Sequence, residues 1–156
     1  MTEVEIEAAD WRDALPEAER LAICAAEAVL AGAPERPEAT GVVVLLTDDA
    51  AVQALNARFR AQDKPTNVLS FPAPANPQGH LGDLALAFEV CAREAQAQGK
   101  SLADHLQHLV AHGTLHLLGY DHMDDAEADH MEGLERVILA GLGVADPYAA
   151  ERGEHG

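Results

Sequence analysis

Apolar and polar residues alternate or cluster along the chain in ways that predict a small β-sheet. Residues 3–9 alternate weakly, which is typical of an edge strand. Residues 42–46 form a continuous aliphatic run, which predicts a strand buried on both faces. Residues 67–71 and 81–88 predict two further strands, antiparallel to each other across a proline-rich loop at 72–79. The sequence therefore predicts a sheet of about four strands and leaves their order open.

Helical periodicity occupies the segments between and after these strands. Start and stop signals predict about five helices, which cover residues 16–31, a segment from Thr47 or Asp48 past Phe59, residues 89–98, a segment from Ser101 to Gly119, and a segment from Asp124 to 141–143. The expected core face of the second helix includes Val52, Leu55 and Phe59, and that of the last includes Met131, Leu134 and Ile138. We expect an α+β fold in which these helices pack on a mixed sheet.

Composition and length support one domain without a membrane segment. A chain of 156 residues with 48% apolar and 4% aromatic residues can build a single aliphatic core. We expect one domain over residues 1–150 and a polar tail at 151–156. No run of 18 apolar residues and no charged leader is present, which favours a cytoplasmic location. Cys24 and Cys91 are isolated, and we expect both to be buried small apolar residues.

The net charge of −17 argues against a general surface that tracks nucleic-acid phosphates. The few basic residues are unevenly spread, because Arg58, Arg60 and Lys64 lie within seven positions. One interpretation is a solvated helix end, where cations complement the helix dipole. The other is a local binding site for an anion beside a metal ion.

Histidines in the helix that begins at Ser101 are the main candidates for chemistry. His112 and His116 are four residues apart and so lie on one helix face, where both rings can reach one metal ion. Gly119 predicts the end of the helix, and the chain that follows can bring His122 back toward the pair. Three imidazoles leave a fourth tetrahedral position open, which is typical of a catalytic zinc site. Nickel, copper or cobalt would also suit such ligands.

Two other histidines lie on the same helix face. His108 and His116 are two turns apart, ~12 Å along the axis, and cannot both bind one ion. A site that pairs His108 with His112 is the lesser alternative, and a histidine-rich surface without metal is another. His105 also falls on this face. The turn at Gly119 favours the set His112, His116 and His122.

The histidine spacing also matches the pattern H-x-x-x-H-x-x-G-x-x-H of metal-dependent peptidases except at one position. Those enzymes place a glutamate directly after the first histidine, where it serves as the base. Here that position is Gly113. The missing carboxylate argues against peptidase chemistry.

Three motifs resemble those of the YbeY family of bacterial metal-dependent endoribonucleases. They are HGTLHLLGYDH at 112–122, LNARFRAQDKPTNVLSFP at 55–72 and LGDLAL at 81–86. The resemblance implies single-strand-specific cleavage of RNA in 16S rRNA 3′-end maturation and ribosome quality control. It also implies one zinc ion per chain and, as partners, ribosomal RNA, small-subunit ribosomal proteins and a ribosome-associated GTPase.

The resemblance also assigns roles to individual residues. It implies that His112, His116 and His122 are the metal ligands and that Arg60 is functionally important. A guanidinium suits a scissile phosphate because it offers a planar fork of charged donors. We therefore expect Arg60 and His112 to be catalytic, and Arg60 and Lys64 to bind substrate.

Several other polar residues have more than one possible role. Asp83 either orients a ligand histidine or supports a turn, and Asp121 is a candidate partner for a metal-bound histidine. His108, His80 and Asp83 are possible general bases, and the nucleophile is either water or the 2′-hydroxyl of RNA. Two other functions remain open: a metal hydrolase of another class, such as a peptidase, or a non-catalytic ribosome-assembly module. In that module Asp83 or His108 would complete a structural zinc site.

Overall fold

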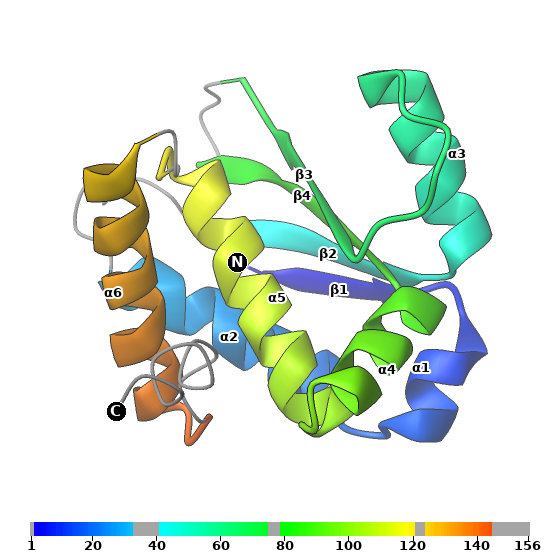
Figure 1. Ribbon diagram of the computed structural model, residues 1–156, viewed down its shortest axis with the longest axis horizontal. Helices are drawn as coiled ribbons and strands as arrows, with labels where there is room; N and C mark the ends of the chain where they lie inside the picture. Colours follow the sequence, from blue (N-terminus) through cyan, green and yellow to red (C-terminus); the bar gives the residue numbers. More distant parts are fainter. Residues whose placement is uncertain (1, 33–40, 75–78, 121–123, 145–156) are drawn as a thin grey trace.

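The computed structural model describes residues 2–32, 41–74, 79–120 and 124–144 (Figure 1). These ranges contain four strands and six helices, and their order along the chain is β1 (Glu3–Ile6), α1 (Ala9–Ala14), α2 (Ala18–Gly32), β2 (Gly41–Thr47), α3 (Asp49–Arg60), β3 (Val68–Pro72), β4 (His80–Ala87), α4 (Phe88–Ala97), α5 (Leu102–Leu117) and α6 (Asp125–Gly141). The α+β class and the sheet of four strands are confirmed.

The sheet has the order β1-β2-β4-β3 and is mixed. β1 pairs with β2 and β2 pairs with β4 in parallel, whereas β3 pairs with β4 in the antiparallel direction. The predicted antiparallel pair is therefore confirmed, and β1 lies at an edge as expected. β3 forms the other edge, so one side of its backbone is free to contact other parts of the chain.

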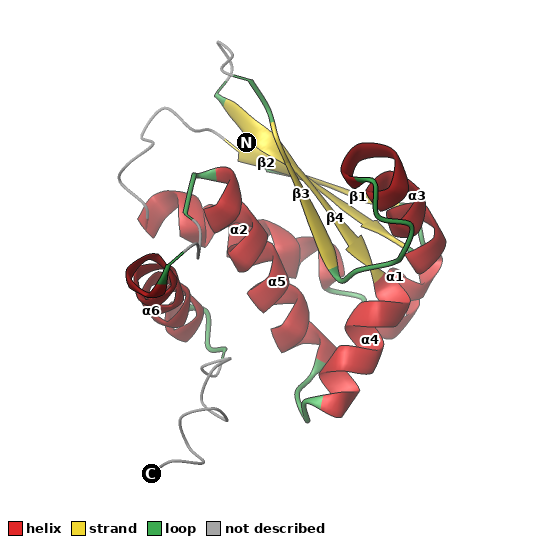
Figure 2. Cartoon of the chain, turned by 45° about the horizontal axis from the view of Figure 1, so that its top comes forward, coloured by secondary structure: helices red, strands yellow, loops and turns green. Residues whose placement is uncertain are grey.

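Helices cover both faces of the sheet (Figure 2). On one face α2 and α5 pack on the sheet, and α6 packs on these two helices. The main core lies there, and it includes Val44 of β2, Leu84 of β4 and Leu115 of α5, all fully buried. On the other face α3 covers a smaller cluster that contains Val52, Leu69 and Ala85. Alternate residues of β2 and β4 thus pack on opposite faces of the sheet, as the continuous apolar run at 42–46 predicted for β2.

The predicted helix starts are confirmed by their capping hydrogen bonds. The side chains of Asp48, Ser101 and Asp124 each accept a hydrogen bond from the backbone N–H three residues later, at 2.8, 3.1 and 2.8 Å. These contacts satisfy N–H groups that have no partner within the helix. They fix where α3, α5 and α6 begin.

Two sequence predictions about elements were incomplete. Helix α1 was not predicted, because six residues carry too little periodicity; Trp11 anchors it by burying its ring and donating from Nε1 to the Thr47 carbonyl at 2.9 Å. Phe88 was expected to end a strand but begins α4, where its ring packs edge-on against Trp11. Both features depend on contacts between distant segments.

Two predictions about burial were wrong. Phe59 was assigned to the core face of α3 but is 58% exposed, and its ring lies edge-on to the Phe71 ring beside a second cavity. Cys24 was expected to be buried and is exposed, whereas Cys91 is buried as predicted. Burial also raises the pKa of the Cys91 thiol, so this group stays protonated.

The expected polar tail at residues 151–156 lies outside the described residues. Within the described ranges, none of the helices is long and apolar enough to cross a membrane.

Candidate functional site

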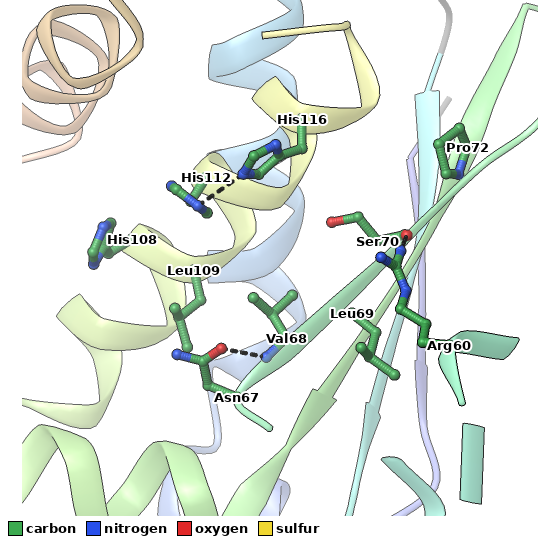
Figure 3. A pocket seen from close by; sticks show the side chains of 10 residues that line it. All are labelled: Arg60, Asn67, Val68, Leu69, Ser70, Pro72, His108, Leu109, His112 and His116. Carbon is green, nitrogen blue, oxygen red and sulfur yellow. Dashed lines mark hydrogen bonds between the residues drawn. The ribbon is translucent and has the colours of Figure 1, made fainter. Parts of the chain in front are cut away.

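A groove of about 490 Å³ runs between α5 and the edge strand β3 (Figure 3). It brings together three histidines of α5, an arginine of α3 and the residues of β3, and its lining consists of Arg60, Asn67, Val68, Leu69, Ser70, Pro72, His108, Leu109, His112 and His116. None of these lining residues carries a carboxylate. In a chain of net charge −17, the groove is thus a local exception to the acidic surface.

The predicted pair of histidines converges at one point of the groove. The Nε2 atoms of His112 and His116 lie 3.1 Å apart, and both rings are partly exposed (Figure 3). Two nitrogens bound to one tetrahedral zinc ion are about 3.3 Å apart, given Zn–N bonds of about 2.05 Å. The two side chains therefore fit a shared metal ion.

The turn that should present the third histidine begins as expected. Helix α5 ends at Leu117, and Gly119 has a φ of +104°, which favours glycine. His122 and Asp121 lie outside the described residues, so their predicted roles remain predictions.

A buried carboxylate from α6 contacts two of the α5 histidines. Glu135 is 0% exposed, and its Oε1 is in direct hydrogen-bond contact with Nδ1 of His112. Its other oxygen, Oε2, lies 3.4 Å from Nε2 of His108. A buried carboxylate is costly unless it is paired, so these contacts account for its place in the core.

Ligand atoms of His108, His112 and Glu135 all lie within 4.8 Å of one another, so this group could hold a metal ion. His112 belongs both to this group and to the pair with His116. The sequence prediction considered a site with His108 and His112 as the lesser alternative, but it did not include Glu135. The sequence feature that could have identified Glu135 is its position four residues after Met131, which places a charged side chain on the apolar face of the predicted helix.

Arg60 reaches the groove from the opposite face of the sheet. It is the last residue of α3, which stops there because Ala61 adopts the left-handed conformation, with φ +55° and ψ +33°. Its Nη2 donates a hydrogen bond to the Ser70 carbonyl on the edge strand (Figure 3). Its guanidinium lies 5.6 Å from the centroid of the Phe71 ring. These contacts hold the cation in the same groove as the histidine pair. Lys64 is exposed and is not among the lining residues, and its role remains a prediction.

Gly113 lies on the face of α5 that packs against the sheet. A Cβ atom at this position would be 2.7 Å from Cδ2 of Leu84 and 3.3 Å from Oγ of Ser70. Both distances are shorter than ordinary carbon contacts, so a side chain would push α5 away from β3 and β4. The position that carries the peptidase base is thus closed to a glutamate here, which argues further against the peptidase alternative.

The candidate general bases lie in different places. His108 lines the groove, whereas Asp83 lines a second cavity with Phe59 and Phe71. The Asp83 carboxylate pairs with Nε2 of His80 at 2.9 Å. Among the described residues, Asp83 is therefore placed as a partner of His80 rather than of a groove histidine.

Asn67 is held at one end of the groove by a chain of hydrogen bonds. Its amide Nδ2 donates to Oε1 of Glu94 at 3.0 Å, and its Oδ1 accepts from the Val68 backbone N–H at 2.6 Å. The same Glu94 oxygen lies 2.9 Å from Nε2 of His105, which is 2% exposed. Burial lowers the pKa of His105, although the hydrogen bond with Glu94 opposes this effect.

The lowered pKa of His105 predicts a loss of stability in mild acid. The unfolded chain, in which histidine has a pKa of about 6.5, takes up the proton more readily than the folded protein. Stability from this group is therefore complete above about pH 6.5 and falls as the pH drops toward the folded-state pKa. We expect the melting temperature to fall less between about pH 7.5 and 5 in His105→Gln than in the wild type.

The control is His130→Gln, which removes an exposed histidine of α6. Its melting temperature should depend on pH as in the wild type. An equal pH dependence in His105→Gln and the wild type would contradict the assignment of this effect to His105.

Together, the fold and groove define a small α+β protein with a histidine-lined groove suited to a metal ion. A family model described as Endoribonuclease YbeY matches residues 5–143. A relative from Azorhizobium caulinodans named Endoribonuclease YbeY is 54% identical over 145 residues, covering 90% of this chain and 91% of the relative. Another with this name, from Paramagnetospirillum magneticum, is 52% identical over 160 residues, covering 95% of each chain. The chain belongs to the endoribonuclease YbeY family, which confirms the resemblance seen in its motifs.

A solved structure supports the fold. The solution structure of TM1509 from Thermotoga maritima matches with a TM-score of 0.61 and 22% identity, covering 99% of this chain and 93% of that chain. At this level of identity, the match shows a shared fold.

Proposed function

We propose that this protein is a metal-dependent endoribonuclease that cleaves single-stranded RNA in the groove between α5 and β3. The observation that carries the proposal is that one groove holds both the converging pair of His112 and His116 and the cation of Arg60. Family membership supports RNA as the substrate, since the relatives are named endoribonucleases.

The metal ligands in this proposal are His112, His116 and His122. The first two already present their Nε2 atoms to one point, and three imidazoles suit zinc, with one ion per chain. A zinc ion held there supplies Lewis acidity to the phosphodiester group. We prefer this set to the group formed by His108, His112 and Glu135, because the motif at 112–122 that resembles the family's contains all three histidines and neither His108 nor Glu135.

Arg60 binds the scissile phosphate in this proposal. Its guanidinium is pre-positioned by the Ser70 carbonyl and the Phe71 ring, so little side-chain freedom remains to be lost on binding. Because the lining residues of the groove carry no carboxylate, the phosphate meets no acidic side chain in the lining itself despite the charge of −17. Lys64 adds electrostatic attraction from outside the groove.

The dimensions of the groove support a preference for single-stranded RNA. A volume of about 490 Å³ falls within the usual range of small-ligand sites, so it suits a segment of one strand. Double-stranded RNA is recognised mainly across a wide, shallow minor groove, which needs a broader contact surface than a groove of this volume.

Within the cell, we propose that the enzyme acts in the cytoplasm on ribosomal RNA, in 16S rRNA 3′-end maturation and ribosome quality control. Small-subunit ribosomal proteins and a ribosome-associated GTPase would be its partners. Partners that deliver the RNA would offset the weak general attraction between this acidic chain and nucleic acid.

The proposal is tested with metal-loaded protein on a single-stranded RNA and on a duplex of the same sequence. We expect cleavage of the single strand to exceed that of the duplex at least about 10-fold, and we expect His116→Ala to abolish it. The matched control His130→Ala removes an exposed histidine of α6 and should cleave at the wild-type rate. Equal cleavage of both substrates would contradict the single-strand preference. Activity that survives in His116→Ala would contradict the assignment of the site.

A further inference from the structure

We propose that Glu135 is a positioning residue of the metal site, which holds His112 with its proton on Nδ1 so that Nε2 is left to bind the ion. The inference rests on the proposed metal site. It assigns to α6 a direct part in a site whose three proposed ligands lie at 112–122, before α6 begins.

Because Glu135 is buried, its carboxylate depends on neighbouring side chains for hydrogen bonds. The side chain is 0% exposed, and its two oxygens are directed at two histidines of the neighbouring helix. An ionised carboxylate only accepts hydrogen bonds, so in this proposal the atom of His112 that faces it carries the proton. Direct contact between Oε1 and Nδ1 leaves no space for an ion between them.

The orientation of the His112 ring follows from this contact. A neutral imidazole with its proton on Nδ1 has an unprotonated Nε2, which is the form that binds a metal. In this structure, that Nε2 points at Nε2 of His116, 3.1 Å away. Hydrogen bonds from a metal-bound histidine to a carboxylate fix the ring and raise its basicity.

The second carboxylate oxygen of Glu135 contacts another histidine of α5. It lies 3.4 Å from Nε2 of His108, so the carboxylate contacts histidines one helical turn apart. Contact with both residues holds α6 against α5, and these are the helices that flank His122 in the sequence. Glu135 thus couples the ring orientation of His112 to the packing of α6, the helix that follows the proposed ligand His122 in the sequence.

The experiment compares Glu135→Gln and Glu135→Leu with Asp129→Asn, a control that removes an exposed negative charge from the same helix. Zinc affinity is measured by competition with a chromophoric chelator, and folding is checked by circular dichroism. Loss of such a carboxylate partner typically weakens metal binding 10- to 100-fold. We expect about 10-fold weaker binding in Glu135→Gln, where an amide oxygen still accepts from His112, and a larger loss in Glu135→Leu. Asp129→Asn should bind as the wild type does.

Nitrogen-15 NMR of the histidine rings in metal-free protein gives a readout that a merely structural role would not change. We expect the proton of His112 on Nδ1 in the wild type and a mixture of the two tautomers in Glu135→Leu. A proton on Nε2 in the wild type, or unchanged zinc affinity in both Glu135 variants, would overturn the inference.

The outcome also separates this inference from the proposed function. If both Glu135 variants bind zinc normally and His116→Ala does not, the metal site stands and only the role of Glu135 is wrong. If the wild type binds no metal, both proposals fail.

Discussion

Arg60→Ala should cleave single-stranded RNA at least about 100-fold more slowly than the wild type while it binds zinc with unchanged affinity. Removing one preorganised donor from a developing negative charge commonly costs 10²- to 10³-fold in rate. Metal affinity should not change, because Arg60 contacts the Ser70 carbonyl and the Phe71 ring rather than any histidine that the structure describes. Cleavage rates and zinc affinities of the same preparations measure both effects.

Arg58→Ala is the matched control for this prediction. Arg58 is exposed on the same helix, lies over the Phe59 ring at 5.1 Å and is not among the lining residues of the groove. It should retain cleavage within about threefold, since distant surface charges are screened by salt. Equal losses in Arg58→Ala and Arg60→Ala would mean that only general charge attraction is at work. Arg60→Lys should fall between the two, because lysine keeps the charge and loses the planar fork.

Gly113→Glu should destabilise the fold by about 3 kcal/mol or more and should create no peptidase activity. Overpacking a close-packed interior costs about 1–3 kcal/mol, and burying an unpaired carboxylate adds to this. The contact with Leu84, which is fully buried, leaves α5 little room to move. Chemical unfolding measures the change, and a peptide substrate tests the activity.

Two alanine variants separate packing from helix propensity. Alanine is more favourable than glycine within a helix by about 1 kcal/mol. In Gly133→Ala, whose nearest neighbour atom would be 3.9 Å away, that gain should appear. In Gly113→Ala, overpacking should outweigh this gain, with a net loss of stability of about 1–2 kcal/mol.

A Gly113→Glu protein as stable as the wild type would contradict this account of the helix–sheet contact.

Features of the sequence that act over a few residues were predictive. Asp48, Ser101 and Asp124 mark helix starts because each cap requires only the backbone N–H three residues later. The pair of His112 and His116 was also predictable, because one helical turn alone brings them together.

Features that depend on long-range packing were not predictable to the same degree. The order of β1-β2-β4-β3 depends on pairing between distant strands, which no local pattern encodes. Phe59 has helical spacing suited to the core, yet it is exposed beside a cavity that it lines with Phe71 of β3. Glu135 contacts a histidine 23 positions away, and its sequence signal was a single charge on an apolar helix face.

The placement of the groove explains how one arginine became part of a site on the far face of the sheet. Arg60 leaves α3 beside the edge strand, and its guanidinium reaches a carbonyl of β3. In a central strand, the backbone carbonyls on both sides form hydrogen bonds within the sheet. An edge strand has one row of carbonyls that faces no neighbouring strand, and these can accept other hydrogen bonds. The position of β3 at the edge is therefore what allows Arg60 and the α5 histidines to share one cavity.

The central claim is that one metal ion held by His112 and His116 is required for RNA cleavage in this groove. Its most direct test is a zinc titration of metal-free protein, with bound zinc and cleavage of a single-stranded RNA measured in the same samples. We predict that cleavage rises in proportion to bound zinc and stops rising at one ion per chain, and that His116→Ala neither binds zinc tightly nor cleaves. Full cleavage by metal-free protein, or by His116→Ala, would contradict the claim.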